Sequence, residues 1–212
     1  MNPDIAVAQL DLPALLALAA VLGWASGFRL YAVVFLVGAA GALEMIPLPE
    51  GLQLLQSPAV LWASGCMLLV EFFADKIPGL DSLWDLVHSV IRIPAGAALA
   101  AGVFGLDAGA MAFIAALMGG TLAASSQAAK TTSRAAINTS PEPFSNVGAS
   151  LLEDGLVVGA VWLATAQPLV FGVLLCIVVV LLGWLTVVLF KFLRAVLQRV
   201  RRWWARPMNS AP

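Results

Sequence analysis

The sequence has little charge and no alternation of polar with apolar residues. Only 11% of its 212 residues are charged, whereas about a quarter of an ordinary soluble domain is. Hydrophobic residues make up 61% and form long runs, as membrane spans do and soluble cores do not. A β-barrel would need short alternating segments, which these runs do not provide. Together these features exclude an ordinary soluble domain and predict an all-α integral membrane protein.

Cysteine is also scarce, and basic residues are missing at the start of the chain. Cys66 and Cys176 each lie inside an apolar run, so we expect small buried side chains rather than a disulfide or a metal site. The first thirteen residues contain two Asp and no Lys or Arg. A secretory signal peptide has a basic beginning, so the first apolar stretch is expected to be retained.

About six transmembrane helices are expected, some of them broken or kinked. The expected spans are Leu12–Leu43, Pro58–Ala74, a stretch from near Ser82 to Leu106 kinked at Pro94, Ala108–Ala129, Val147–Ala166 and Pro168–Phe190. The motif GWASGFR, which ends at Arg29, stands in the middle of the first stretch and indicates a broken or sharply tilted helix. We therefore predict one helical membrane domain over residues 1–190 and a basic, amphipathic cytoplasmic tail over residues 191–212.

Lys and Arg fall on alternate connections between these spans. Lys76 and Arg92 flank the second connection, Lys130 and Arg134 lie on the fourth, and six more basic residues lie in the tail. The first, third and fifth connections have none. The positive-inside rule then predicts six crossings of a bacterial inner membrane, with both termini in the cytoplasm.

The expected partners are the lipid bilayer and, for the basic tail, anionic lipid headgroups. A homo-oligomer is possible, and no nucleic acid is expected. Six spans also allow an inverted repeat of three plus three, as in many transporters. Gly23 with Gly27 and Gly155 with Gly159 form GxxxG pairs, which allow close helix approach.

One segment concentrates polar residues between two spans. Asp81, Asp85, His88 and Arg92 are spaced four, three and four apart, which puts them on one stripe of a helix. That stripe either lies in water at the membrane interface or faces the interior of the bundle. The second alternative is favoured because the third span has to begin near Ser82. Asp81, Asp85 and His88, with Glu71 or Asp75, could also ligate a metal, but no tight motif such as HExxH is present and no cofactor is predicted.

Other charges lie inside the apolar stretches. Arg29 has no nearby helix end and should pair with Glu153, Asp154 or Glu71, because an unpaired arginine at that depth is costly. A third polar stripe is formed by Asn146, Ser150 and Glu153. A fourth stripe repeats every four residues and is expected to be an ordinary anchor at the cytoplasmic end of a span. Its members are Ser126, Lys130, Arg134 and Asn138.

Three stretches resemble a bacterial inner-membrane family catalogued as a domain of unknown function, label four-one-two-six. They are SGFR, EFFADKIPGLDSLWDLVHSVIRIPAGA and SNVGASLLED, and the resemblance covers roughly residues 12–166. It implies a compact multi-span helical protein and no activity. By motif match, its polar signature is Arg29, Glu71, Asp75, Lys76, Asp81, Asp85, His88, Arg92, Asn146, Glu153 and Asp154. With Lys130 added, these are the candidate substrate- or ion-binding residues.

Three functions remain open at this point. The first is a secondary transporter or channel for an anionic or amphiphilic substrate, which requires a polar cavity reaching mid-membrane. The second is a membrane-embedded enzyme, such as a metal-assisted lipid hydrolase, which requires three or more converging ligands. The third is a structural or assembly protein, in which every ion is paired. No catalytic residue is assigned.

Overall fold

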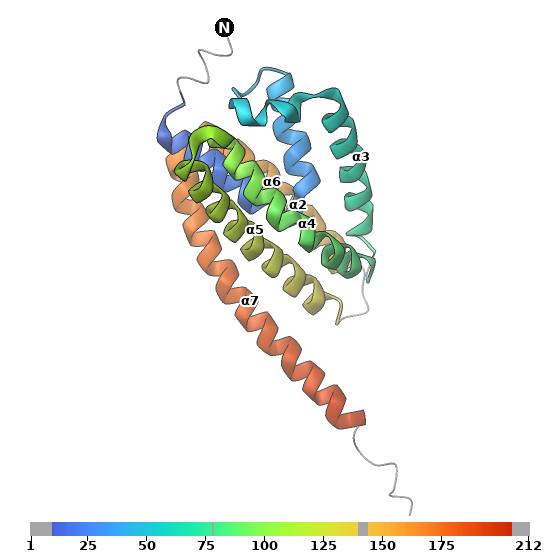
Figure 1. The fold of residues 1–212 in the computed structure, drawn as a ribbon. Coiled ribbons are helices and arrows are strands. Elements are labelled where there is room, and N and C mark those ends of the chain that lie inside the picture. Colours follow the sequence, from blue (N-terminus) through green and yellow to red (C-terminus); the bar gives the residue numbers. More distant parts are fainter. Residues whose placement is uncertain (1–9, 78, 140–143, 205–212) are drawn as a thin grey trace, which may run out of the picture.

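The computed structural model describes residues 10–77, 79–139 and 144–204, and all regular elements within them are helical. By length and composition, five of these helices could cross a membrane, or six if the bent pair of η1 and α3 counts as one span. The predicted all-α, multi-span fold is thus confirmed (Figure 1). In chain order the elements are α2 (Leu12–Ala42), η1 (Glu50–Gln56), α3 (Pro58–Ala74), α4 (Leu80–Phe104), η2 (Leu106–Ala108), α5 (Ala110–Ile137), α6 (Phe144–Ala166) and α7 (Pro168–Trp204).

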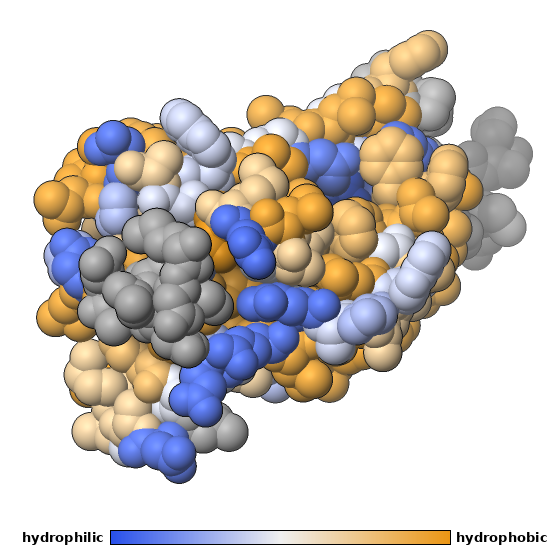
Figure 2. All heavy atoms as spheres, turned by 90° about the horizontal axis from the view of Figure 1, so that it is seen from above, coloured by the Kyte–Doolittle hydropathy of each residue, from blue (hydrophilic) through white to orange (hydrophobic). Residues whose placement is uncertain are grey.

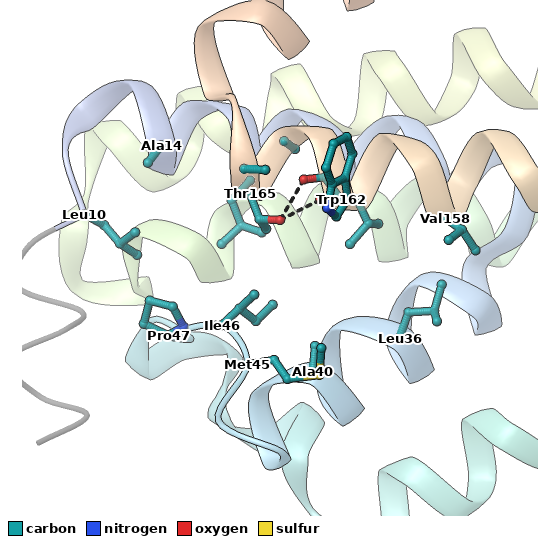
Figure 3. A pocket seen from close by; sticks show the side chains of 14 residues that line it. Leu10, Ala14, Leu36, Ala40, Met45, Ile46, Pro47, Val158, Trp162 and Thr165 are labelled. Atoms are coloured by element: carbon teal, nitrogen blue, oxygen red, sulfur yellow. Dashed lines mark hydrogen bonds between the residues drawn. The ribbon is translucent and has the colours of Figure 1, made fainter. Parts of the chain in front are cut away.

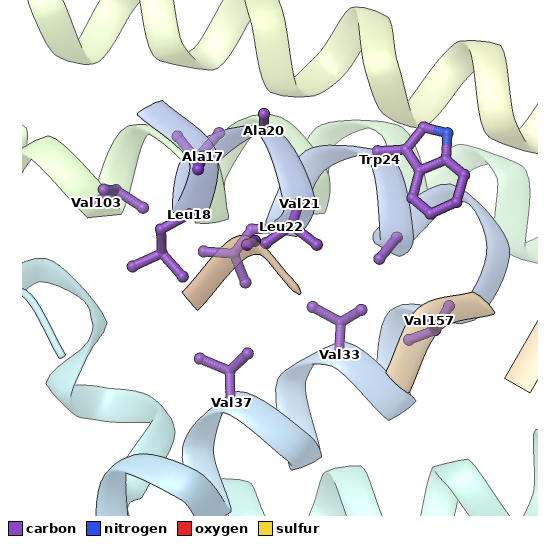
Figure 4. Close-up of a cluster of buried hydrophobic side chains, with 14 of the residues drawn as sticks. Ala17, Leu18, Ala20, Val21, Leu22, Trp24, Val33, Val37, Val103 and Val157 are labelled. Carbon is purple, nitrogen blue, oxygen red and sulfur yellow. The ribbon is translucent and has the colours of Figure 1, made fainter. Parts of the chain in front are cut away.

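Helix α2 is broken at Arg29, as the GWASGFR motif predicted. Arg29 has φ −145° and ψ 73°, outside the helical region. A straight helix of 31 residues would be about 46 Å long. Instead the two limbs of α2, residues 12–28 and 30–42, fold back toward each other (Figure 4). Val33 and Val37 of the second limb share a buried cluster with Leu18 and Leu22 of the first.

Both ends of α2 therefore lie at the same end of the bundle. Leu10, Ala40 and Ala166 line one apolar cavity of about 510 Å³ there (Figure 3). Pro13 and Leu169, at the starts of α2 and α7, line a neighbouring pocket. Helix α2 thus enters and leaves the bundle at one end, with the Arg29 break at its far tip.

This path differs from the six crossings expected from hydropathy. Helices α3 to α7 run alternately between the two ends of the bundle, so Leu12 and Trp204 lie at opposite ends (Figure 1). Apolar length alone suited α2 to a full span, and the backbone reversal at Arg29 changed its course. The inverted repeat stays a prediction, and the unbroken α5 does not match the break in α2.

Local sequence features set where several helices begin and whether they continue. Gly79, with φ 87°, makes the short turn between α3 and α4, a conformation that glycine adopts without steric strain. Asp11 caps α2 by accepting a hydrogen bond of 3.0 Å from the Ala14 N–H. Helix α4 continues through Pro94, where a kink was expected. The α4 stripe can therefore run uninterrupted into the bundle.

The first glycine pair brings α2 against α5. A Cβ on Gly23 would lie 2.4 Å from the Gly119 Cα, and one on Gly27 would lie 2.0 Å from the Ser126 Oγ. By contrast, a Cβ on Gly155 or Gly159 would meet nothing within 4 Å. The expectation of close helix approach is confirmed for the first pair and is wrong for the second within this chain.

The outer surface of the bundle is strongly apolar. Large side chains of α4 and α7, such as Val90 and Trp184, point outward and are 76% and 66% exposed. In the view onto the end where α2 begins, groups of hydrophilic spheres lie between larger areas of hydrophobic ones (Figure 2). Cys66 and Cys176 are also exposed on this surface, so the expectation that they are buried is wrong. An apolar run looks the same in sequence whether its residues face the core or lipid.

Helix α7 extends past the bundle. It continues unbroken to Trp204, so the described part of the basic tail continues the last span as a helix, as the sequence indicated (Figure 1). At 37 residues it is about 55 Å long, against about 30 Å for a hydrocarbon core. Residues 205–212 of that tail, like residues 1–9 of the predicted amino-terminal segment, lie outside the described residues.

Candidate functional site: a buried ion network

The tip of α2 enters a network of charged side chains. Arg29 is fully buried, and each guanidinium nitrogen has a different partner. Its Nη1 lies 2.9 Å from the Asp75 Oδ2, and its Nε lies 3.0 Å from the Asp154 Oδ1. The Nη2 donates to the Ser150 Oγ at 2.7 Å and to the Ser150 carbonyl at 3.2 Å. The pairing expected with Asp154 is confirmed, and the contact with Glu153 is longer, at 3.8 Å.

Asp75 is the meeting point of three cations. Its Oδ2 accepts a hydrogen bond of 2.7 Å from the Lys130 Nζ, in addition to the Arg29 contact. Arg134 Nη2 lies 3.8 Å from the same oxygen. Burial by itself raises the pKa of Asp75, but the charges of Lys130 and Arg29 lower that pKa by a larger amount, so the net shift is downward. This carboxylate is therefore held in its charged form.

Lys130 and Arg134 connect Asp75 to α6. Arg134 donates to both carboxylate oxygens of Glu153, at 2.9 and 3.3 Å. Lys130 Nζ lies 3.5 Å from the Glu153 Oε2 and also donates to the Phe28 carbonyl at 3.1 Å, just before the break in α2. The expected role of Lys130 and Arg134 as surface anchors is wrong, because both are at most 1% exposed.

Arg92 forms a second centre. It pairs with Glu71 through its Nη2 and with the Asp85 Oδ1 at 2.8 Å through its Nη1. The same Nη1 donates to the Gln127 Oε1 at 2.8 Å. Lys130 Nζ lies 3.1 Å from the Asp85 Oδ1 and so joins the two centres. Glu71, expected as a partner of Arg29, pairs with Arg92 instead.

Neutral amides extend the network toward the end of the bundle. Asn138 donates to Asp81 at 3.0 Å and to the Ser82 Oγ at 2.9 Å. Asn146 donates to the Asn138 Oδ1 at 2.7 Å, and its own carbonyl accepts from Arg134 at 3.0 Å. Asp81 is thus satisfied by amides and by the Gly79 and Ser82 N–H groups.

His88 lies on the same stripe but makes no ion pair among the contacts described. Its Nδ1 lies 2.9 Å from the Trp84 carbonyl, and its ring stacks on the Trp84 ring with centroids 3.9 Å apart. Tyr31 packs edge-on against the same imidazole, with ring centroids 5.8 Å apart. These contacts fix the imidazole by aromatic packing.

The outer rim of the network is formed by Lys76 and Asp154. Lys76 Nζ lies 2.9 Å from the centre of the Phe72 ring and donates to the Ser150 Oγ at 3.4 Å. Burial lowers the pKa of Lys76, which the nearby Asp154 only partly offsets. The Asp154 side chain is 26% exposed, whereas Arg29 and Asp75 are not exposed at all. The network therefore opens outward between the end of α3 and the middle of α6, where Asp154 lies.

Some buried polar atoms of the network have no hydrogen-bond partner within the described residues. Three are carboxylate oxygens, the Glu71 Oε2, the Asp75 Oδ1 and the Asp85 Oδ2, and three are guanidinium nitrogens, the Arg92 Nε and the Arg29 Nε and Nη1. The two Arg29 nitrogens lie at ion-pair distance from Asp154 and Asp75 without forming a hydrogen bond. A buried polar atom without a partner is destabilising. The site therefore has acceptor capacity left for a proton or water, and donor capacity left on the two arginines.

The structure brings the candidate residues together on one side of the bundle. The stripe Asp81, Asp85, His88 and Arg92 faces the interior, at 0 to 7% exposure, so the interior alternative is correct. Its opposite face, including Leu83 and Leu86, is exposed toward the surroundings. The polar candidates on α6, Asn146 and Glu153, are buried in the same region.

Sequence reasoning did not choose four members of the network as candidates. They are Gln127, Arg134, Asn138 and Ser150. Arg134 and Asn138 belong to the four-residue repeat on α5, and Ser150 belongs to the α6 stripe. The regular spacing was therefore the available signal. Arg92, Lys130 and Arg134 lie buried within α4 and α5 rather than on connections between helices. Most of the alternation of basic connections, on which the predicted topology was based, is therefore absent.

Comparison with known protein families identifies the family of this chain. Residues 16–188 match the family described as a domain of unknown function, DUF4126. The chain belongs to this family. The DUF4126 match extends beyond the three resembling stretches and includes most of α7, so the sixth apolar stretch is part of the family domain. The family description states no activity, and neither a curated protein nor a solved structure gives a significant match.

Proposed function

We propose that this DUF4126 protein is a secondary transporter or channel for a small oxyanion or an anionic amphiphile. The single observation that supports it best is the convergence of Arg29, Lys130 and Arg134 on one oxygen of Asp75. Three cations around one carboxylate form a place suited to an anionic group. Arginine in particular matches the geometry of carboxylates and phosphates.

The broken helix supports the same proposal. Transporters commonly bind substrate at interrupted helices, whose free backbone groups face the site. Here the Phe28 carbonyl, just before the break, accepts a hydrogen bond from Lys130. Non-helical backbone at membrane depth is tolerated only where protein or a water-filled cavity surrounds it. The ion network provides that surrounding at Arg29.

A structural role is the second candidate, and the pairing of the ions favours it. Each of the four buried cations contacts at least one carboxylate. The two apolar pockets, at the opposite end of the bundle, do not involve the network. Yet a buried ion pair stabilises a fold little better than apolar packing of similar volume. Burying four cations and the carboxylates that pair with them is therefore a poor way to stabilise helix packing.

The lipid hydrolase finds no support in the geometry. Among residues 10–77, 79–139 and 144–204, no group of three or more His, Cys, Asp or Glu side chains is placed to hold a metal ion. The carboxylates that a metal would need are held by arginine and lysine instead.

We further propose an orientation in a bacterial inner membrane. The exposed basic residues Lys191, Arg194, Arg199 and Arg201 lie on the extension of α7, at the end of the bundle toward which the network lies. The positive-inside rule puts this end in the cytoplasm, and these residues would contact anionic headgroups. The start of α2 then lies on the opposite side.

Flux through proteoliposomes tests the proposal. The purified protein is reconstituted, and uptake of acetate or inorganic phosphate is followed by an internal pH dye or a radiolabel. We expect uptake above empty liposomes, and a loss of at least tenfold in Arg29→Lys, which keeps the charge but not the planar fork, at about 1.4 kcal/mol per tenfold. Arg194→Gln, an exposed position on α7, is the matched control and should retain flux.

Two results separate the candidates. Wild-type flux equal to that of empty liposomes for both probes would contradict transport of small oxyanions and favour the structural role. Equal flux in wild type and Arg29→Lys, with unchanged melting temperature, would remove Arg29 from the site.

A further inference from the structure

Asp75 differs from the other carboxylates in its position along the chain. It is the C-cap of α3 and the first residue of the short connection to α4. Its own carbonyl accepts a hydrogen bond of 3.1 Å from Arg134, so backbone and side chain are both held by cations. A residue at the end of a helix moves more easily than one within it, because fewer helical hydrogen bonds fix it.

The carboxylate of Asp75 does not use all the binding capacity around it. Its Oδ2 receives the contacts from Arg29, Lys130 and Arg134, while its Oδ1 is buried and has no hydrogen-bond donor in the described part of the chain. Arg29 meets it through one nitrogen only and gives its others to Ser150 and Asp154. An arginine fork grips a carboxylate or phosphate best through two parallel bonds, which Asp75 does not receive.

A second acid shares the same cations. Glu153 lies 2.9 Å from the Arg134 Nη2 and 3.5 Å from the Lys130 Nζ. Removing the Asp75 carboxylate would take away the one acid that all three cations share, and would leave Arg29 with Asp154, Lys130 with Asp85 and Arg134 with Glu153 as their nearest acids. A free oxyanion of carboxylate size would restore the balance of charge.

We propose that Asp75 is a tethered anion, occupying the place where the acid group of the transported oxyanion binds. The oxyanion, a carboxylate or a phosphate, displaces Asp75 from Arg29 and Lys130 during transport. This inference rests on the proposed function and specifies its substrate chemistry. Asp75 then serves as a gate that keeps the cations neutralised while the site is empty of substrate.

The rim residues indicate the way in. Lys76 follows Asp75 directly, and its Nζ lies within 3.4 Å of the Ser150 Oγ that also accepts from Arg29. An anion arriving between Lys76 and Asp154 would meet Lys76 first and Arg29 next. Movement of the α3–α4 connection would carry Asp75 and Lys76 together, since they are adjacent.

Chemical rescue tests the proposal in detergent solution. Asp75→Ala opens the space of one carboxylate, and Asp75→Asn fills that space without charge. Melting temperatures are measured in chloride, acetate, inorganic phosphate and a short-chain phosphatidic acid, in separate arms at matched ionic strength. We expect acetate or phosphate to raise the melting temperature of Asp75→Ala toward that of wild type and to leave Asp75→Asn unchanged. A response to phosphatidic acid alone would identify a lipid headgroup as the source of the oxyanion.

Equal shifts in Asp75→Ala, Asp75→Asn and wild type would overturn the proposal, because they would show a general salt effect. If Asp75→Ala does not fold in chloride, its monodisperse yield is compared after purification in acetate, where recovery supports the proposal and continued absence overturns it. Flux through the wild-type protein without rescue of Asp75→Ala would support transport and contradict the role proposed for Asp75. Rescue without flux would show an oxyanion site in a protein that does not transport the probes.

Discussion

Arg92 and Glu71 are both buried, but their pairings are not equivalent. Glu71 has Arg92 as its ion-pair partner, and its Oε2 has no hydrogen-bond donor among the described residues. Arg92 has three partners, because Asp85 and Gln127 also accept from it. The loss of Arg92 therefore leaves Glu71 without its ion-pair partner, whereas the loss of the Glu71 charge leaves Arg92 paired with Asp85 and Gln127.

We expect Arg92→Gln to destabilise the fold by roughly 3–5 kcal/mol, the usual effect of leaving a buried charge without its partner. Glu71→Gln should cost clearly less, and the double variant should recover part of the loss. Unfolding in detergent, followed by melting temperature, measures all three. Equal losses in the two single variants would contradict this asymmetry.

Asp75 predicts how stability depends on pH. Burial raises the pKa of this carboxyl, but Lys130 and Arg29 lower it more, so the pKa in the folded protein is below its usual value of about 3.9. A group whose pKa is lower in the folded state stabilises the fold above the unfolded value, and that stability is lost as the pH falls through the folded value.

The melting temperature of wild type should therefore fall as the pH drops below about 4. Asp75→Asn, which cannot titrate, should show a shallower fall over the same range. Parallel curves for the two proteins would show that Asp75 contributes nothing to the acid sensitivity. Arg194→Gln serves as the control for a charge change outside the network.

At the scale of elements, the close contact of Gly23 and Gly27 with α5, here called the glycine seam, fixes where the break in α2 lies relative to α5. A Cβ on Gly27 would lie 2.2 Å from the Ala123 carbonyl oxygen, and backbone atoms cannot move aside as a flexible side chain does. The seam therefore holds the first limb of α2 close to α5, so that Arg29 and Lys130 reach the same carboxylate.

We expect Gly27→Ala to destabilise the fold by about 1–3 kcal/mol, the usual cost of overpacking, and to weaken the proposed flux. Gly159→Ala, on the open face of α6, should be neutral or slightly stabilising, because alanine favours a helix over glycine. Melting temperatures of the two variants provide the comparison. A Gly27→Ala protein as stable as Gly159→Ala would argue against this close approach.

For the whole molecule, the path of α2 decides the topology. If α2 enters and leaves at one end, residues near Asp11 and Gln53 lie on the same side of the membrane, opposite Arg201. Six crossings would put Asp11 on the side of Arg201 instead. The two arrangements thus differ at a single accessible position.

Cysteine labelling distinguishes them. In a background with Cys66 and Cys176 replaced by alanine, Asp11→Cys and Gln53→Cys should react with a membrane-impermeant maleimide on intact cells. Arg201→Cys should react only after lysis. Labelling of Asp11→Cys only after lysis, with Gln53→Cys labelled on intact cells, would restore the six-crossing arrangement.

Much of the fold could be predicted because it depends on local features. The apolar runs and the prolines, glycines and charged residues between them predicted the helices, although α5 extends eight residues beyond its expected end at Ala129. GWASGFR gave the break at Arg29. The three-and-four spacing of Asp81, Asp85, His88 and Arg92 gave a single stripe, and the need for a full-length span turned it inward. These predictions succeeded because helix periodicity and hydrophobic length are properties of consecutive residues.

The sequence by itself determined that this is an all-helical, multi-span protein of the DUF4126 family with a broken first helix and charges inside its bundle. Only the tertiary structure decided that the limbs of α2 return to one end and that Lys130 and Arg134 meet Asp75 rather than the membrane surface. The physical reason is that the sequence at a helix break does not determine the direction in which the chain continues. A lysine near a helix end also looks the same in sequence whether it contacts lipid headgroups or pairs with a buried carboxylate. Both outcomes depend on which elements pack together, and the glycine seam between α2 and α5 settles that only in three dimensions.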